Sequence, residues 1–163
     1  MIVLDTSTLV LLAKSDLLSL LAERTPLLVP DQVRREAIAK PERYDAQMIA
    51  RMVEHHTIKV VRAAWTRQHQ QRLQGDFDLG LGEAAALLVA QRKRAVLGTD
   101  DGPAIKAAKV LGVPFVTAIH ILVELYQKGR IDRAMALAKL ERLQRMGRYS
   151  TQIIEDASGR LRK

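Results

Sequence analysis

Five acidic residues are the first candidates for chemistry in this chain. Some directly follow a short apolar run, and others stand in segments with helical periodicity. The five are Asp5, Glu36, Glu83, Asp100 and Asp101. Clustered carboxylates repel one another unless a cation neutralises them, and a ligand set made only of oxygen atoms suits Mg²⁺ or Mn²⁺. If these side chains converge, they predict a metal centre that can activate water for phosphodiester cleavage.

The elements around these acids decide whether they converge. Short apolar runs predict strands at residues 2–4, 26–29, 58–61, 96–98 and 113–116. Helical spacing predicts helices at residues 8–21, 30–38, 43–56, 63–73, 83–92, 102–111, 119–129 and 131–146, with a loop at 75–82. Alternating elements of this kind predict an α/β protein with a central, mostly parallel sheet and helices on both faces. The length predicts a single domain over residues 1–149, followed by a polar tail or short helix over 150–163.

A sheet of this type would bring the acids together, because ligands bind beyond the carboxyl ends of parallel strands. Asp5 and the pair Asp100-Asp101 each follow a predicted strand. Within the pair we favour Asp100 as the metal ligand, since it lies nearer the end of its strand. Glu36 and Glu83 lie on predicted helices next to such strand ends.

Composition narrows the class of partner. The formal net charge is +8 and the isoelectric point about 10.1, which favours association with polyanions such as nucleic acid. Aromatic residues make up only 4%, so we expect binding through backbone phosphates rather than through a platform of stacked bases. The absence of cysteine excludes disulfides, thiolate-bound metals and a thiol nucleophile. The charged, interrupted apolar segment at the start predicts neither a membrane span nor a signal peptide, and we expect a cytoplasmic protein.

Four short motifs, in order along the chain, resemble those of the PIN-domain family. They are Asp5-Thr6-Ser7, Val29-Pro30 leading to Glu36, Gly82-Glu83-Ala84, and Leu97-Gly98-Thr99-Asp100-Asp101. The resemblance spans about residues 1–130. The segments 111–114 and 128–131 are similar to a prokaryotic branch that is related by analogy to the toxins of toxin–antitoxin pairs (VapC-like). The sequence departs from the commonest toxin pattern at Glu83, where that branch usually has Asp.

The resemblance implies a three-layer α/β/α fold, Mg²⁺ or Mn²⁺ as cofactor, and cleavage of single-stranded RNA. It also suggests an antitoxin protein and a second copy of the chain, forming a homodimer, as partners. Carried over by position, Asp5 is the central metal ligand and Glu36, Glu83 and either Asp100 or Asp101 are the other acids. Supporting hydroxyl or backbone contacts are then assigned to Thr6, Ser7 and Thr99.

Each candidate also has a purely structural explanation. Asp5, and one of Asp100 and Asp101, could simply cap the helices that follow them. Glu36 could be a solvated helix charge, and Glu83 could be a first-turn acid that complements the helix dipole. The basic residues are solvated faces by default, although some lie near the expected site or on flanking helices. Those assigned a weak role in binding substrate phosphates are Arg92, Lys93 and Lys106.

Parts of the sequence are also compatible with three other functions. Residues 80–85 match a dinucleotide-binding fingerprint, but no convincing strand precedes them. A phosphatase of the haloacid dehalogenase type, with Asp5 as nucleophile, needs a second Asp two positions later, where this chain has Ser7. The main alternative is a PIN-like module that binds RNA or a partner protein without cutting.

Overall fold

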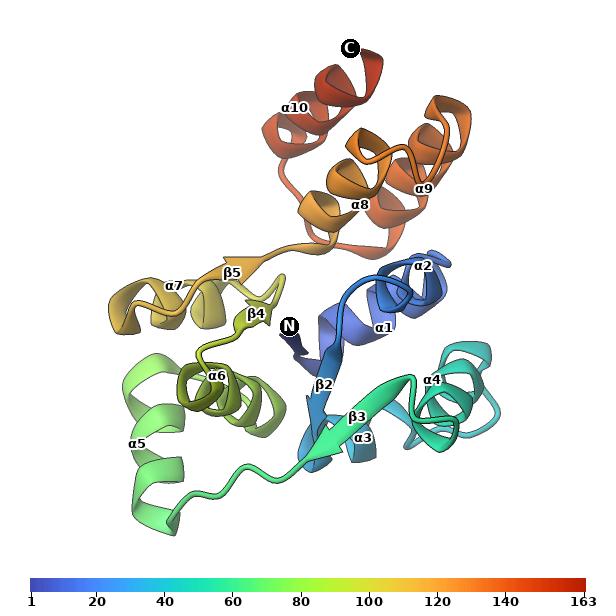
Figure 1. The fold of residues 1–163 in the computed structure, drawn as a ribbon. Helices are drawn as coiled ribbons and strands as arrows, with labels where there is room; N and C mark the ends of the chain where they lie inside the picture. The colour runs from blue at the N-terminus through green and yellow to red at the C-terminus, as the bar shows by residue number, and fades with distance from the viewer.

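The computed structural model describes residues 1–163, and its centre is one parallel sheet of five strands (Figure 1). The strands are β1 (Ile2–Leu4), β2 (Leu27–Pro30), β3 (Ile58–Val61), β4 (Val96–Gly98) and β5 (Phe115–Val116). The helices are α1 (Thr6–Lys14), α2 (Leu18–Ala22), α3 (Asp31–Ala37), α4 (Tyr44–Glu54), α5 (Arg67–Phe77), α6 (Leu81–Lys93), α7 (Gly102–Leu111), α8 (Ala118–Gln127), α9 (Arg133–Met146) and α10 (Thr151–Arg162). The predicted α/β class with a parallel sheet is confirmed.

The order of the strands creates a crevice at the middle of the sheet. The order is β3-β2-β1-β4-β5, and every pair is parallel. The chain therefore winds outward from β1 in one direction, and then from β4 in the other. Such a reversal leaves room for a ligand beyond the carboxyl ends of the two central strands. Asp5 and Thr99 are the residues that directly follow those ends.

Helices cover the sheet on both sides. α6 packs against β1, β2 and β4, and its residues from Ala84 to Ala90 are all buried. Four of these seven residues are alanines, whose small side chains let α3, α5 and α7 approach closely. α1 contacts α2, α4 and α8 and lies on the other side of the sheet (Figure 1). One continuous apolar core joins the sheet to both helical layers.

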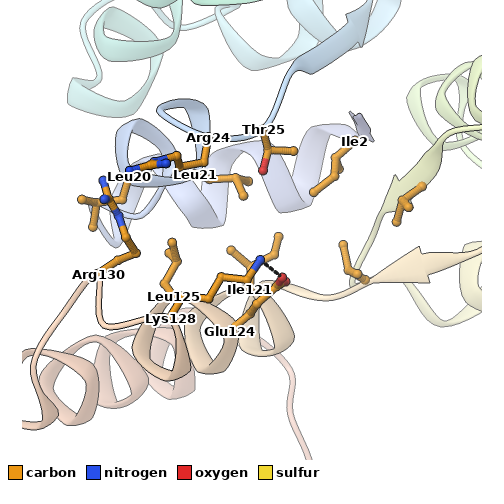
Figure 2. Close-up of a pocket in the computed structure, with 12 residues that line it drawn as sticks. Ile2, Leu20, Leu21, Arg24, Thr25, Ile121, Glu124, Leu125, Lys128 and Arg130 are labelled. Atoms are coloured by element: carbon orange, nitrogen blue, oxygen red, sulfur yellow. Dashed lines mark hydrogen bonds and ion pairs between the residues drawn. The ribbon is translucent and has the colours of Figure 1, made fainter.

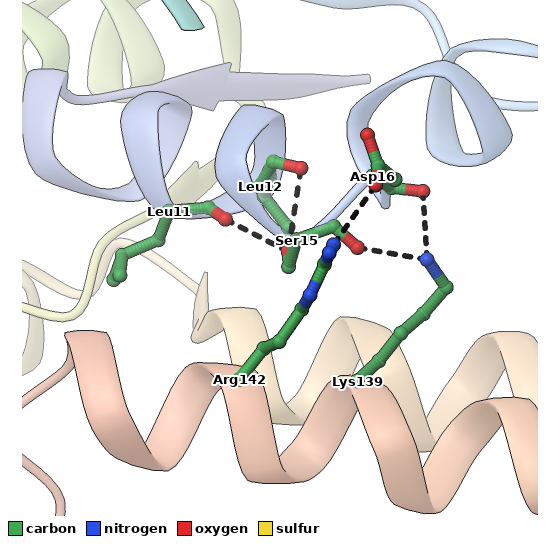
Figure 3. A network of polar contacts seen from close by, with 6 residues as sticks. All are labelled: Leu11, Leu12, Ser15, Asp16, Lys139 and Arg142. Carbon is green, nitrogen blue, oxygen red and sulfur yellow. Dashed lines mark hydrogen bonds and ion pairs between the residues drawn. The ribbon is translucent and has the colours of Figure 1, made fainter.

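The predicted helix over residues 8–21 is wrong, because two helices occupy this segment. The break lies at Ser15 and Asp16, and Asp16 has a left-handed φ of 55°. The Ser15 hydroxyl donates to the carbonyl oxygen of Leu11 at 2.7 Å, and Lys139 donates to the carbonyl oxygens of Ser15 and Asp16 (Figure 3). Leucines are buried on both sides of the break, so their spacing alone did not reveal it.

The predicted loop over residues 75–82 is also wrong over most of its length. α5 continues to Phe77 and α6 begins at Leu81, so only three residues connect them. Asp78 ends α5 in a left-handed conformation with φ 54°. Gly75 lies inside α5, and Gly82 inside α6. The glycines suggested a loop, but Gly82 allows close packing of α6 against Glu36 and Thr6.

The last three helices pack on one another beside the sheet (Figure 1). For residues 150–163 the sequence left open a polar tail or a short helix, and the structure has the helix α10. Its Ala157 and Leu161 are buried, and α10 contacts both α8 and α9. No helix of the chain has both the length and the apolar character needed to cross a membrane.

A largely apolar cavity of about 550 Å³ lies between α2 and α8 (Figure 2). Its lining includes Ile2 and Val96, the first residues of β1 and β4. The cavity is therefore near the amino ends of these strands, away from the crevice at their carboxyl ends.

Candidate active site at the carboxyl ends of β1 and β4

The Asp5 carboxylate lies directly beyond the carboxyl end of β1 and is fully buried. Its Oδ2 accepts a hydrogen bond from the Thr99 hydroxyl at 2.6 Å, and its Oδ1 accepts from the Thr8 N–H at 3.0 Å and the Ser7 hydroxyl at 3.4 Å. Burial raises the pKa of Asp5 to about 7, although the hydrogen bonds from Thr99 and Thr8 lower it, and the charge of Glu83 raises it further. Asp5 caps α1, and it is also an ionisable group with little water around it.

Glu36 reaches the site from the last turn of α3. The Thr6 hydroxyl donates a hydrogen bond to Glu36 Oε2 at 2.6 Å. Both side chains lie against Gly82, where a Cβ atom would come 2.7 Å from Glu36 Oε2 and from Thr6 Oγ1. Glycine at this position therefore lets α6 begin close to α1 and α3.

Glu83 stands in the first turn of α6. Its carboxylate turns back onto Gly80, the N-cap residue, and takes the space that a Cβ atom there would need. Partial burial raises the pKa of Glu83, and the charges of Asp101 and Glu36 raise it further, while nearby backbone N–H groups lower it. The pKa of Glu83 therefore depends on the other acids of the site, and its carboxylate also caps its own helix.

Asp100 is held by segments from three parts of the chain. Its oxygens accept hydrogen bonds from the Thr8 hydroxyl at 2.7 Å, the Ala118 N–H at 3.1 and 3.2 Å, and the Tyr149 hydroxyl at 2.7 Å. These bonds join α1, the start of α8 and the segment after α9. Because both of its oxygens are engaged, Asp100 is less available to a metal ion than the sequence suggested.

Asp101 has a freer carboxylate. Its Oδ2 accepts from the Ala104 N–H at 3.0 Å and so caps α7, but no group of the chain donates to its Oδ1. Its charge also raises the pKa of Glu83. Hydrogen bonding therefore favours Asp101 over Asp100 as a metal ligand. Asp100 lies nearer the strand end, but on folding it acquires partners that are distant in the sequence and that engage both of its oxygens.

Tyr149 forms a wall beside these acids. Its ring lies over Gly147, where a Cβ atom would collide with the ring. Burial raises the pKa of the Tyr149 hydroxyl far above its usual value, and the charge of Asp100 adds to this shift. The hydroxyl therefore stays protonated and donates to Asp100 at neutral pH.

A cleft of about 390 Å³ is lined by three of the acids and by two cations, while Asp5, which is buried, and Glu36 do not line it. The residues that line the cleft are Ser7, Val10, Leu11, Lys14, Glu83, Asp100, Asp101, Met146, Gly147 and Arg148. Neither Lys14 nor Arg148 forms an ion pair, and neither do the five acids of the site. Charges of both signs therefore face the cleft without neutralising each other in direct contacts.

The three basic residues that the sequence associated with phosphates lie elsewhere. Arg92 and Lys93 are in the last turn of α6, at the opposite end of this helix from Glu83. Arg92 contacts the carbonyl oxygen of Ala64. Lys106 is exposed on α7 and does not line the cleft. None of the three shares the cleft with the acids.

A comparison with protein families agrees with this arrangement. The family model for the PIN domain matches residues 1–161. The chain belongs to the PIN-domain family. No curated protein shows significant similarity to it in sequence. PIN domains are typically nucleases, which are hydrolases, and they generally use divalent metal ions.

The acids of this PIN domain fit a divalent cation by their chemistry. Their ligand atoms are all oxygen, no cation of the chain pairs with them, and the pKa values of Asp5 and Glu83 are raised. No three acidic or histidine side chains, however, stand close enough in this structure to hold one ion. Glu83, which now faces Gly80, and Asp101, with its free Oδ1, are the two with most freedom to join Asp5 around a cation.

Four residues of the site in this PIN domain escaped the sequence analysis. Thr8 bonds to both Asp5 and Asp100, and its place three residues after a capping Asp was the available signal. Lys14 follows Ser7 by two helical turns, so helical periodicity could have placed it on the same face. For Tyr149 and Arg148 the sequence offered no signal, because only the packing of α8, α9 and α10 brings their segment to the cleft.

Proposed function

We propose that the chain is a metal-dependent endoribonuclease that hydrolyses phosphodiester bonds of single-stranded RNA. The observation that carries this proposal is the cleft, in which acids without cationic partners face two cations without acidic partners. A general nuclease function follows from membership of the PIN-domain family. The net charge of +8 supports a polyanionic substrate.

The residues take distinct roles in this proposal. Asp5, Glu83 and Asp101 hold Mg²⁺ or Mn²⁺, which when bound supplies a Lewis acid and lowers the pKa of a water molecule. Lys14 and Arg148 bind the phosphates next to the scissile bond. Thr8 and Thr99 position Asp5 through the hydrogen bonds described above.

The remaining acids position the machinery. Glu36 orients Thr6, at the start of α1, and so supports the loop that carries Asp5. Asp100 holds the start of α8 and Tyr149 in place. We expect Asp100→Asn to weaken cleavage less than Asp101→Asn does, because an amide oxygen still accepts hydrogen bonds but binds a cation poorly.

Cleavage of end-labelled single-stranded RNA in Mn²⁺ tests the proposal. Purified protein, free of any partner, is expected to cut, and Asp5→Asn and Glu83→Gln are each expected to reduce the rate by about 100-fold or more. Asp76→Asn is the matched control, since Asp76 is exposed on α5 and has no side-chain partner. Cleavage by Asp5→Asn at the rate of the wild type, or the absence of metal-dependent cleavage over varied substrates, would refute the proposal.

A non-catalytic RNA-binding module is the second candidate. It is favoured by the position of Glu83, turned back onto Gly80, and by the absence of three acids within reach of one cation. The same assay separates the two, because RNA binding without metal-dependent cleavage identifies the module.

We further propose that the nuclease is the toxin of a toxin–antitoxin pair, acts in the cytoplasm and forms a homodimer. The support is the similarity of the segments 111–114 and 128–131 to a prokaryotic branch of the family. Induced expression in a bacterial host should arrest growth, and Asp5→Asn should abolish the arrest. Normal growth at verified expression of soluble protein would count against the toxin role. A monomeric mass in light scattering would count against the homodimer.

A further inference from the structure

A second hollow, of about 310 Å³, lies between the start of α8 and one face of α10. His120 comes from α8, Gln152, Ile153, Asp156 and Arg160 come from α10, and Tyr149 closes one side. A hollow of this size is at the lower end of the range for small-molecule sites. The whole hollow is built from the helices beside the sheet, so it is distinct from the cleft.

The two hollows share one wall. Gly147 lines the cleft, Tyr149 lines the second hollow, and the Tyr149 ring lies directly over Gly147. The Tyr149 hydroxyl donates to Asp100, which also lines the cleft. Gly147 and the Tyr149 ring therefore lie between the cleft and a group bound in the second hollow.

The lining of this hollow suits a planar group with a polar edge. Ile153 is 48% exposed and, with the buried Ile119, offers apolar surface. The side chains of Gln152, Asp156 and Arg160 make no hydrogen bond or ion pair within the chain, so they present both donors and acceptors. An unpaired nucleobase has apolar faces and an edge of donors and acceptors, and proteins recognise single-stranded RNA by these two features.

A phosphate fits this hollow less well than a base does. Asp156 would repel it, and the two cations of the cleft provide a better site for phosphates. We propose that the second hollow binds one unpaired base of the RNA, next to the phosphate held in the cleft. This inference rests on the proposed function in so far as RNA is the ligand, and it assigns base preference to Gln152 and its neighbours on α10.

Binding rather than cleavage tests the inference. Metal-free protein in EDTA is titrated into fluorescein-labelled eight-nucleotide RNAs, rA8, rU8 and rC8, and into a matched ribose-phosphate oligomer without bases. The wild type is expected to bind the best homopolymer at least about tenfold more tightly than the abasic oligomer, because the abasic oligomer offers neither the apolar faces nor the hydrogen-bonding edge of a base.

Two variants locate the contact. Gln152→Ala should reduce the spread of affinities among the three homopolymers, and Ile153→Ser, which removes apolar surface without adding charge, should bring all of them close to the affinity of the abasic oligomer. Both should leave binding of the abasic oligomer unchanged. Gln144→Ala, at an exposed position of α9, is the control and should behave as the wild type.

The outcomes distinguish this inference from the proposed function. Equal affinities of the wild type for all four oligomers overturn the inference, as does base preference that both variants retain, and neither result bears on metal-dependent cleavage. Base preference that the α10 variants remove supports the inference even if no cleavage is found. In that case the chain is the non-catalytic module, and the base site remains.

Discussion

The Asp5 carboxylate lies in a place that disfavours its charge. It is fully buried, and the three groups that donate to it offset only part of the cost of desolvation, since its pKa remains raised to about 7. A divalent cation beside the carboxylate would offset this cost, and so would a proton on the carboxyl group. The raised pKa also has a consequence for the metal-free protein.

Without metal, the free energy of unfolding is expected to fall as the pH rises from about 4 to 7. Burial raises the pKa of Asp5 from 3.8 to about 7, so in this range the folded chain keeps a proton that the unfolded chain has released. The stabilisation is therefore complete below pH 4 and is lost as the pH passes 7, by roughly 4 kcal/mol at most.

Urea denaturation in EDTA at several pH values measures this effect. Asp5→Asn cannot ionise at this position and should lose this part of the pH dependence. The stability of the variant relative to that of the wild type should therefore increase from pH 4 to pH 7. Parallel pH profiles of the two proteins would show that Asp5 titrates normally.

At the residue scale the sequence located the candidate acids but could not rank them. Asp5, Glu83 and Asp101 were predicted as site acids because acids at strand ends and helix starts are visible in the pattern of residues. The engagement of Asp100 was not visible, because its donor Tyr149 is 49 positions away and reaches it only after three helices have packed. The capping role of Asp5 also leaves it in the candidate site, since Asp5 caps α1 at the carboxyl end of β1.

The elements are held together by contacts at their ends. Lys139 of α9 donates to the carbonyl oxygens of Ser15 and Asp16 at 2.8 and 3.3 Å, just beyond the end of α1 (Figure 3). Arg142 of the same helix pairs with the Asp16 carboxylate at 2.9 Å. The strands were predictable because their apolar, β-branched runs are distinctive, but this break was not, because it depends on a side chain from a distant helix.

Lys139→Met is expected to lower the free energy of unfolding by about 1–2 kcal/mol. The substitution removes a positive charge from the carboxyl end of α1 and leaves two carbonyl oxygens without their donor. Arg145→Met is the control, since Arg145 pairs only with Glu141 on an exposed face, and it should cost no more than about 0.5 kcal/mol. Equal losses in the two variants, measured in urea, would contradict this role for Lys139.

Gly82→Ala is expected to destabilise the protein by about 1–3 kcal/mol, because its Cβ would displace Glu36 and Thr6 from the start of α6. Gly75→Ala tests the same change inside α5, where nothing lies within 4 Å of the added atom. The free energy of unfolding of Gly75→Ala should be about 0.5–1 kcal/mol higher than that of the wild type, because alanine has a higher helix propensity than glycine. If both variants were more stable than the wild type, α6 could shift to make room for the added Cβ atom without cost, which would contradict the prediction for Gly82→Ala.

The whole molecule presents an excess of positive charge to the proposed substrate, which carries one negative charge per nucleotide. The formal net charge is +8, and Lys14 and Arg148 stand unpaired at the cleft. These features belong to the folded chain as a whole, because the two cations come from opposite ends of the sequence. Composition predicted the polyanionic partner, but it could not predict which cations face the acids.

Affinity for single-stranded RNA is therefore expected to fall steeply as salt increases. Each phosphate contact contributes about 0.7 to the slope of log affinity against log salt. Lys14→Ala and Arg148→Ala should each reduce the slope by about this amount, whereas Lys106→Ala, away from the cleft, should leave it nearly unchanged. Fluorescence anisotropy between low and physiological salt measures the slopes, and equal slopes for all variants would exclude the two cations as phosphate contacts.

The distances along the chain between hydrogen-bonded partners at the site have a consequence for biosynthesis. Asp5 is 94 positions from Thr99, and Asp100 is a further 49 positions from Tyr149. At about 5–20 residues per second, on the order of ten seconds separate the synthesis of Asp5 from that of its last indirect partner. The site is therefore complete only after the segment that carries Tyr149 has been synthesised and has left the ribosome.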